Sequence, residues 1–150
     1  MWSMGTYLNI ALGLGVGILV VIQGAMNARL TTVLGSVLPT TLVNLSIGAL
    51  VVLAASALWG ELLSVARVAE APRWSLIGGA LGACLVMGVS FLIPRIGAAY
   101  VVALIACGQA LAALLFDHFG WLGVPQMSVS LYRIIGTLLV VFGTMLFGYR

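Results

Sequence analysis

Five long apolar runs dominate this chain of 150 residues, and they limit what it can fold into. Only 6% of the residues are charged and none is a lysine, whereas soluble domains carry roughly 25% charged residues. So few charges cannot cover a water-facing surface, and each run approaches the roughly 20 residues that cross a bilayer as a helix. The sequence therefore predicts an integral membrane protein surrounded by the lipid bilayer.

The five runs predict five membrane-spanning helices and a single transmembrane domain covering residues 1–150. The expected helices cover approximately residues 5–28, 38–60, 74–93, 98–116 and 128–149. No run alternates with a period of two over the length of a barrel strand, which disfavours an outer-membrane barrel. The predicted fold class is all-α, an integral membrane five-helix bundle. An odd number of spans places the two termini on opposite sides of the membrane.

The arginines divide evenly between the two sides of the predicted membrane protein. One side holds Arg67, Arg73 and Arg133, and the other holds Arg29, Arg95 and Arg150. The positive-inside rule orients a protein by the difference in Lys and Arg near the span ends. Because that difference vanishes here, we expect insertion in both orientations, which would allow an antiparallel dimer of ten helices.

Two amides, Gln23 and Asn27, lie one helical turn apart in the first run. An amide without a partner in hydrocarbon costs several kcal/mol, so each must meet another helix, water or a solute. Asn44 in the second run and Gln109 in the fourth could share one polar cavity with them, and Tyr100 is a further candidate for that solute pathway. For any single amide, an interhelical hydrogen bond is the competing interpretation.

Glycines recur in the runs at spacings that let helix backbones approach closely. The positions expected to pack helices are Gly13, Gly17, Gly24, Gly78, Gly82, Gly136 and Gly143. Packing alone explains this pattern. Helices that are lined by glycine and loosely held could also rock, as alternating access requires.

Several charged or titratable side chains lie near the ends of the runs. The expected gating or interfacial residues are Arg29, Arg95, Asp117, His118 and Arg133. Asp117 and His118 are adjacent, so on a helix they point about 100° apart and form no ready-made proton relay. An interfacial turn is the simpler interpretation, and a pH-sensitive gate at His118 is the alternative. No Asp or Glu lies deep in a span, where a proton-coupled cation exporter would titrate one.

The sequence contains no constellation typical of an enzyme. It has one histidine, no phosphate-binding Gly-Lys-Ser or Gly-Lys-Thr motif, and no cluster at metal-ligand spacing. Cys84 and Cys107 lie inside apolar runs and are interpreted as buried thiols. We expect no catalysis, no cofactor, no metal ion and no nucleic-acid partner.

Four short motifs occur in order along nearly the whole chain. They are Gln23-Gly-Ala-Met-Asn27-Ala-Arg29-Leu30, Pro94-Arg95-Ile-Gly97-Ala-Ala, Gly108-Gln109 followed by Asp117-His118-Phe-Gly120, and Arg133-Ile-Ile-Gly136. Together they resemble the YdcZ-like family of small inner-membrane proteins, which is placed in the drug/metabolite transporter superfamily. The resemblance implies half of a ten-helix inverted-repeat transporter, with the other half supplied by another chain. By their match to the family's motifs, it singles out Gln23, Asn27, Arg29, Gln109, Asp117 and Arg133.

The expected function is secondary transport of a small solute across a bacterial-type cytoplasmic (inner) membrane. The chain would work by alternating access, as an antiparallel homodimer or with a paralogous five-helix partner. Two alternatives stay open. One is a dual-topology narrow ion channel in which amides and carbonyls replace hydration. The other is a non-transporting membrane assembly protein in which every amide joins two helices.

Overall fold

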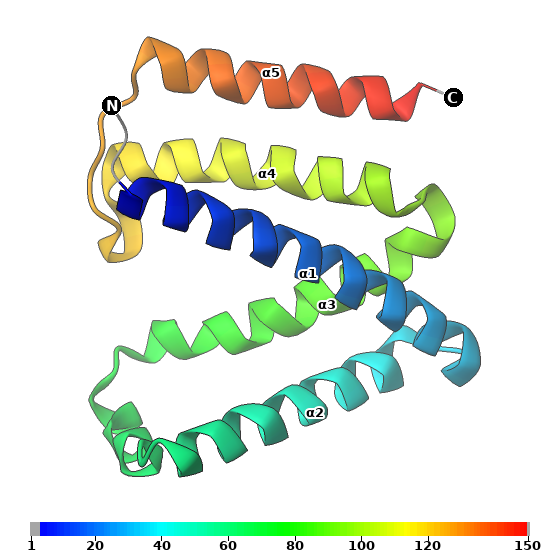
Figure 1. The fold of residues 1–150 in the computed structure, drawn as a ribbon, viewed down its shortest axis with the longest axis vertical. Coiled ribbons are helices and arrows are strands. Elements are labelled where there is room, and N and C mark those ends of the chain that lie inside the picture. The colour runs from blue at the N-terminus through cyan, green and yellow to red at the C-terminus, as the bar shows by residue number, and fades with distance from the viewer. Residues whose placement is uncertain (1–3, 150) are drawn as a thin grey trace. The chain divides into compact units, whose positions relative to one another are not determined.

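The computed structural model describes residues 4–149, which fold into helices and connecting turns (Figure 1). Within this range, five helices are long and apolar enough to cross a membrane. They are α1 (Met4–Leu34), α2 (Val37–Leu58), α3 (Ile77–Ile96), α4 (Ala98–Phe119) and α5 (Leu131–Gly148). The prediction of an all-α protein with five spans is confirmed. Arg150, one of the arginines in the even division, lies outside the described residues.

Backbone signals, more than hydropathy, set the ends of the helices. α1 continues beyond the expected end at Ala28 because nothing interrupts it before Gly35, whose φ of +73° ends the helix. Ser36 then caps α2, since its Oγ accepts a hydrogen bond from the backbone N–H two residues later at 3.3 Å. α5 begins after Ser130, whose side chain caps it in the same manner.

The connections between the remaining helices differ in length. Two 3-10 helices, η1 (Leu62–Glu70) and η2 (Arg73–Leu76), lead from α2 into α3. α3 runs through Pro94 to Ile96, and Gly97 alone separates it from α4 with a φ of +83°, which glycine adopts without steric cost. The connection between α4 and α5 contains the 3-10 helix η3 (Trp121–Gly123).

The contacts divide the chain into two units, one ending at Arg95 and the other beginning at Ile96. In the first unit, α1 and α2 form a hairpin that is closed at its turn and opens away from it (Figure 1). α3 contacts α1 at Gly24, where an added Cβ would lie 2.7 Å from Ile93 Cδ1. In the second unit, α4 and α5 are antiparallel neighbours (Figure 1).

Polar side chains outnumber apolar ones among the buried positions of the described chain. The buried polar residues are Asn27, Thr40, Thr41, Ser90 and Thr144, and the buried hydrophobic residues are Ala28 and Val101. Each buried polar side chain forms a hydrogen bond within its own unit. Large apolar side chains point outward along all five spans, as a bilayer requires. The interpretation of both cysteines as buried is wrong, because Cys84 is exposed and Cys107 is half-buried.

Candidate functional site

Two polar pairs join α1 to α2 in a single register. Next to the turn, the Thr31 hydroxyl donates a hydrogen bond to the Thr40 hydroxyl at 3.0 Å. One helical turn farther away, the Asn44 amide nitrogen donates to the amide oxygen of Asn27 at 3.1 Å. Each step of four residues back along α1 is matched by a step of four forward along α2. The two pairs are therefore successive rungs between the helices.

The rungs follow from local spacing. Residues four apart lie on one face of a helix, so Asn27 and Thr31 share a face of α1, and Thr40 and Asn44 share a face of α2. The turn at Gly35 then brings the two faces together. Asn27 is only 5% exposed, and a buried amide requires such a partner. The threonine rung was missed by the sequence reasoning, although this spacing on both sides of the turn could have found it.

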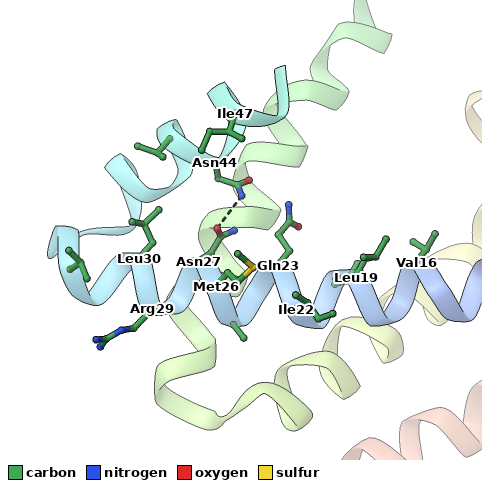
Figure 2. Close-up of a pocket in the computed structure, with 14 residues that line it drawn as sticks. Val16, Leu19, Ile22, Gln23, Met26, Asn27, Arg29, Leu30, Asn44 and Ile47 are labelled. Carbon is green, nitrogen blue, oxygen red and sulfur yellow. Dashed lines mark hydrogen bonds between the residues drawn. The ribbon is translucent and has the colours of Figure 1, made fainter. Parts of the chain in front are cut away.

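Gln23 lies one turn beyond Asn27 on α1, on the side away from the turn at Gly35, and the hairpin opens in this direction (Figure 1). The same register reaches Gly48 on α2 at this level, and a glycine has no side chain to offer. Gln23 is exposed, and its amide forms no hydrogen bond within residues 4–149. Figure 2 shows the bond between Asn27 and Asn44, with Gln23 beside the pair.

A groove of about 1070 Å³ opens between α1 and α2 at this point (Figure 2). Apolar side chains form most of its walls, and its polar lining residues are Gln23, Asn27, Arg29 and Asn44. Arg29 is the one ionisable residue among the described residues that line the groove. Its side chain extends away from the amide pair (Figure 2). The groove is therefore an apolar space with neutral amides set into one side.

The amide pair keeps hydrogen-bonding capacity for a further partner. The bond between the two side chains uses Oδ1 of Asn27 and Nδ2 of Asn44. It leaves Nδ2 of Asn27 as a donor and Oδ1 of Asn44 as an acceptor. Gln23 adds a donor and an acceptor of its own. The groove can therefore recognise a solute through several neutral hydrogen bonds at once.

The other expected pathway residues, Tyr100 and Gln109, lie on α4 in the second unit. Tyr100 is half-buried against the end of α5, where its hydroxyl lies 2.9 Å from the position of a Cβ added to Gly148. Gln109 is exposed, and its amide has no hydrogen bond in the described chain. The amides that the structure brings into one groove are Gln23, Asn27 and Asn44.

Asp117 and Arg133 form an ion pair that connects the end of α4 to the start of α5. Arg133 Nη2 donates to Asp117 Oδ2, and Nη1 of the same guanidinium donates to the Met127 carbonyl at 3.3 Å. The Met127 N–H in turn donates to the Asp117 carbonyl at 2.7 Å. These bonds fold the connection back onto α4. Sequence reasoning named both residues as gating or interfacial candidates, and the structure brings them together.

His118 follows this ion pair on α4 and is exposed. Its ring contacts the adjacent Phe119 ring edge-on, with 4.8 Å between the centroids. Its backbone carbonyl accepts a hydrogen bond from the Gln126 side chain at 3.0 Å. These contacts belong to an ordered turn, and a pH-sensitive gate at His118 stays a prediction.

Arg95 lies in the last turn of α3. Its guanidinium lies 3.4 Å above the centre of the Phe91 ring, and its Nη1 donates to the Phe91 carbonyl one turn earlier. Arg95 is therefore engaged at its helix end and, within the first unit, does not line the groove.

Among the glycines expected to pack helices, Gly24 contacts α3, because a Cβ added to it would lie within 3 Å of the side chains of Ile93 and Val89. An added Cβ would meet nothing within 4 Å at the others, which are Gly13, Gly17, Gly78, Gly82, Gly136 and Gly143. These six positions lie on open faces of the described chain. A packing role for them requires contact from outside their own unit.

Comparison with known proteins identifies a family of inner-membrane proteins to which the chain is similar. The model of the family described as "Putative inner membrane exporter, YdcZ" matches residues 8–146. Inner membrane protein YdcZ of Escherichia coli (strain K12) is 31% identical over 155 residues, which cover 98% of this chain and 99% of that protein. No solved structure matches the chain.

Proposed function

Because the chain belongs to the YdcZ family of inner membrane exporters, we propose that it is a secondary transporter that moves a small solute by alternating access. The chain is a multi-pass inner membrane protein, and five of its helices are suited to span the bilayer. The family description supports transport, and movement out of the cell is the direction that it favours.

The groove between α1 and α2 is the observation that carries this proposal. An amide left without a partner among apolar groups is costly. In an assembly protein, in which every amide joins two helices, Gln23 would be paired as Asn27 and Asn44 are. Among the described residues, Gln23 instead has no hydrogen-bond partner, and it lines a groove large enough for a small molecule. A solute that visits this groove would supply the missing hydrogen bonds.

A second five-helix unit in antiparallel orientation completes the transporter in this proposal. It is either another copy of the chain or a paralogous partner. The open faces at glycines such as Gly13 and Gly17 support this arrangement, because they would let a partner helix approach closely. The even division of arginines supports it as well, because such a chain has no strong preference for one orientation.

In this proposal, no carboxylate in the groove takes part in transport. No acidic residue is among the groove's described lining residues. The proposal therefore favours facilitated movement, or coupling through the solute's own protons or through an ion held by amides and carbonyls. Gln23, Asn27 and Asn44 would bind the solute near the middle of the membrane.

Efflux from reconstituted vesicles tests the proposal. Vesicles holding the purified chain are loaded with a defined mixture of neutral, anionic and cationic small molecules, and mass spectrometry follows their release. We expect saturable release of at least one solute, slowed tenfold or more in a Gln23→Leu, Asn27→Leu double variant. Asn9→Leu removes an amide from α1 outside the groove and serves as the matched control. Equal release from the wild type and the double variant for every solute contradicts the proposal.

A further inference from the structure

We propose that the open rung, Gln23 opposite Gly48, is the recognition position of the groove. We infer that it takes an uncharged solute with a hydrogen-bond donor and acceptor side by side, as in a carboxamide, on an apolar body. The solute class inferred in this way is that of the proposed transporter, so this part of the inference rests on the proposed function.

The register of the hairpin identifies this position. The pairs Thr31–Thr40 and Asn27–Asn44 are consecutive rungs, and the same spacing of four residues leads next to Gln23 on α1 and Gly48 on α2, which form no contact. In each of the first two rungs, the two side chains form a hydrogen bond with each other. At the third, one member carries a primary amide and the other carries no side chain. The polar ladder therefore ends on a group that has a donor and an acceptor and no partner.

Space is available next to that amide. A Cβ added to Gly48 would meet nothing within 4 Å, and the hairpin of α1 and α2 opens away from its turn (Figure 1). Val16, Leu19 and Ile47 belong to the groove's apolar wall. A solute with an apolar body can therefore lie against the wall while its polar end faces Gln23.

The lack of a counter-charge near Gln23 favours a solute whose polar end is uncharged. The groove has no acidic lining residue to balance a cation, and Arg29 points away from the amides (Figure 2). An ion at the Gln23 level would lose water without gaining a counter-charge, which is far more costly than burying a neutral hydrogen-bonding group. A primary amide offers N–H and C=O side by side, so a planar group with the same pair can bind it with two bonds.

Three probes of nearly the same shape test this inference: benzamide, the benzamidinium cation and the benzoate anion. Binding of each to the purified full-length chain in lipid nanodiscs is measured by calorimetry. We expect benzamide to bind at least tenfold more tightly than either ion, and Gln23→Leu to weaken benzamide binding tenfold or more. Asn9→Leu should leave the order and the affinities unchanged. Wild-type protein that binds either ion as well as benzamide, or no benzamide, overturns the inference.

A negative charge introduced at position 23 tests directly whether this side chain recognises the probes. Gln23→Glu keeps the side-chain shape, and at mildly alkaline pH its carboxylate should reverse the order so that benzamidinium binds best. An unchanged order in a folded Gln23→Glu protein overturns the assignment of Gln23 as the recognising group.

Chemical labelling provides a readout that does not depend on Gln23→Glu folding. Gln23→Cys is placed in a background with Cys84→Ser and Cys107→Ser and is treated with N-ethylmaleimide. We expect labelling that benzamide slows at least threefold and benzamidinium does not, whereas Asn9→Cys is unaffected by either probe. A cysteine at position 23 that is never labelled indicates a groove filled by lipid or a second copy, and it overturns the inference.

The two proposals can fail separately. Benzamide binding that depends on Gln23, without release of any solute from vesicles, removes the transport function and keeps the recognition position. Solute release that depends on Gln23, with the wrong preference among the three probes, keeps transport and removes the solute class.

Discussion

Asn44 on α2 donates its side-chain amide to the amide oxygen of Asn27 on α1 across 3.1 Å. This bond joins two helices that share one groove, and it fixes which amides are engaged within the protein and which amide is left for a partner. Its strength can be measured directly. Hydrogen bonds between membrane helices average about 0.6 kcal/mol and reach about 2 kcal/mol in model systems.

The first prediction concerns the energy of this amide pair. Asn27→Leu and Asn44→Leu should each lower the free energy of unfolding, and the double variant should lose less than the sum of the two. We expect a coupling energy of about 0.5–2 kcal/mol in a double-mutant cycle. Reversible unfolding in mixed micelles measures it. The corresponding cycle between Asn9→Leu and Asn44→Leu should be additive, and additivity in the first cycle would contradict the bond.

The threonine rung predicts unequal effects of two similar substitutions. Thr40 is fully buried and also donates to the Ser36 carbonyl at 3.0 Å, whereas Thr31 is half-buried. Thr40→Val removes both of its hydrogen bonds and should cost about 1–3 kcal/mol of unfolding free energy. Thr31→Val removes one and should cost about 0.5–1.5 kcal/mol. A larger loss for Thr31→Val than for Thr40→Val would contradict this account.

The ion pair between Asp117 and Arg133 predicts an ordered connection between α4 and α5. Asp117→Asn or Arg133→Gln should speed hydrogen exchange in residues 120–130 and lower stability by about 1 kcal/mol, since the pair is partly exposed. The swapped pair Asp117→Arg, Arg133→Asp should restore part of the protection. Mass spectrometry of the exchanged segment measures this. Protection that is the same in the single variants and the wild type would show that the pair does not order the connection.

Substitution by leucine should affect stability differently at Gly24 and at Gly17. Leucine at position 24 would collide with Ile93 and Val89, so Gly24→Leu should lower the free energy of unfolding by about 1–3 kcal/mol. Gly17→Leu meets open space within the chain and should leave the stability of a single chain nearly unchanged. Unfolding at high dilution in detergent compares the two. Equal losses would show that the Gly24 contact with α3 is unimportant.

The even division of arginines predicts how the chain inserts into the membrane. Reporter fusions at both termini should detect both orientations of the wild type. Arg67→Gln together with Arg73→Gln leaves more arginines on the side opposite the amino terminus and should fix the amino terminus outside the cytoplasm. Arg29→Gln with Arg95→Gln should have the opposite effect. A single fixed orientation of the wild type would remove the argument for an antiparallel homodimer.

Several features of the site could be predicted from local sequence. The pair Gln23 and Asn27 was recognised from helical spacing, and Asn44 from its depth in the second run. The end of α1 was placed too early because the apolar run fades near Ala28, although the backbone continues as a helix until Gly35. Hydropathy measures how a segment partitions into lipid and does not report whether its backbone hydrogen bonds are interrupted.

The sequence alone determined that the chain is helical and crosses the membrane five times, because apolar length and scarcity of charge act on each segment separately. Tertiary structure decided which polar groups meet. It pairs Asn27 with Asn44, joins Asp117 to Arg133, and leaves Gln23 without a hydrogen bond from the described residues in an open groove. Such pairing depends on where a turn places the face of one helix against another, and no single segment contains that information. The unpaired amide, on which both proposals rest, is visible only when the two helices are seen together.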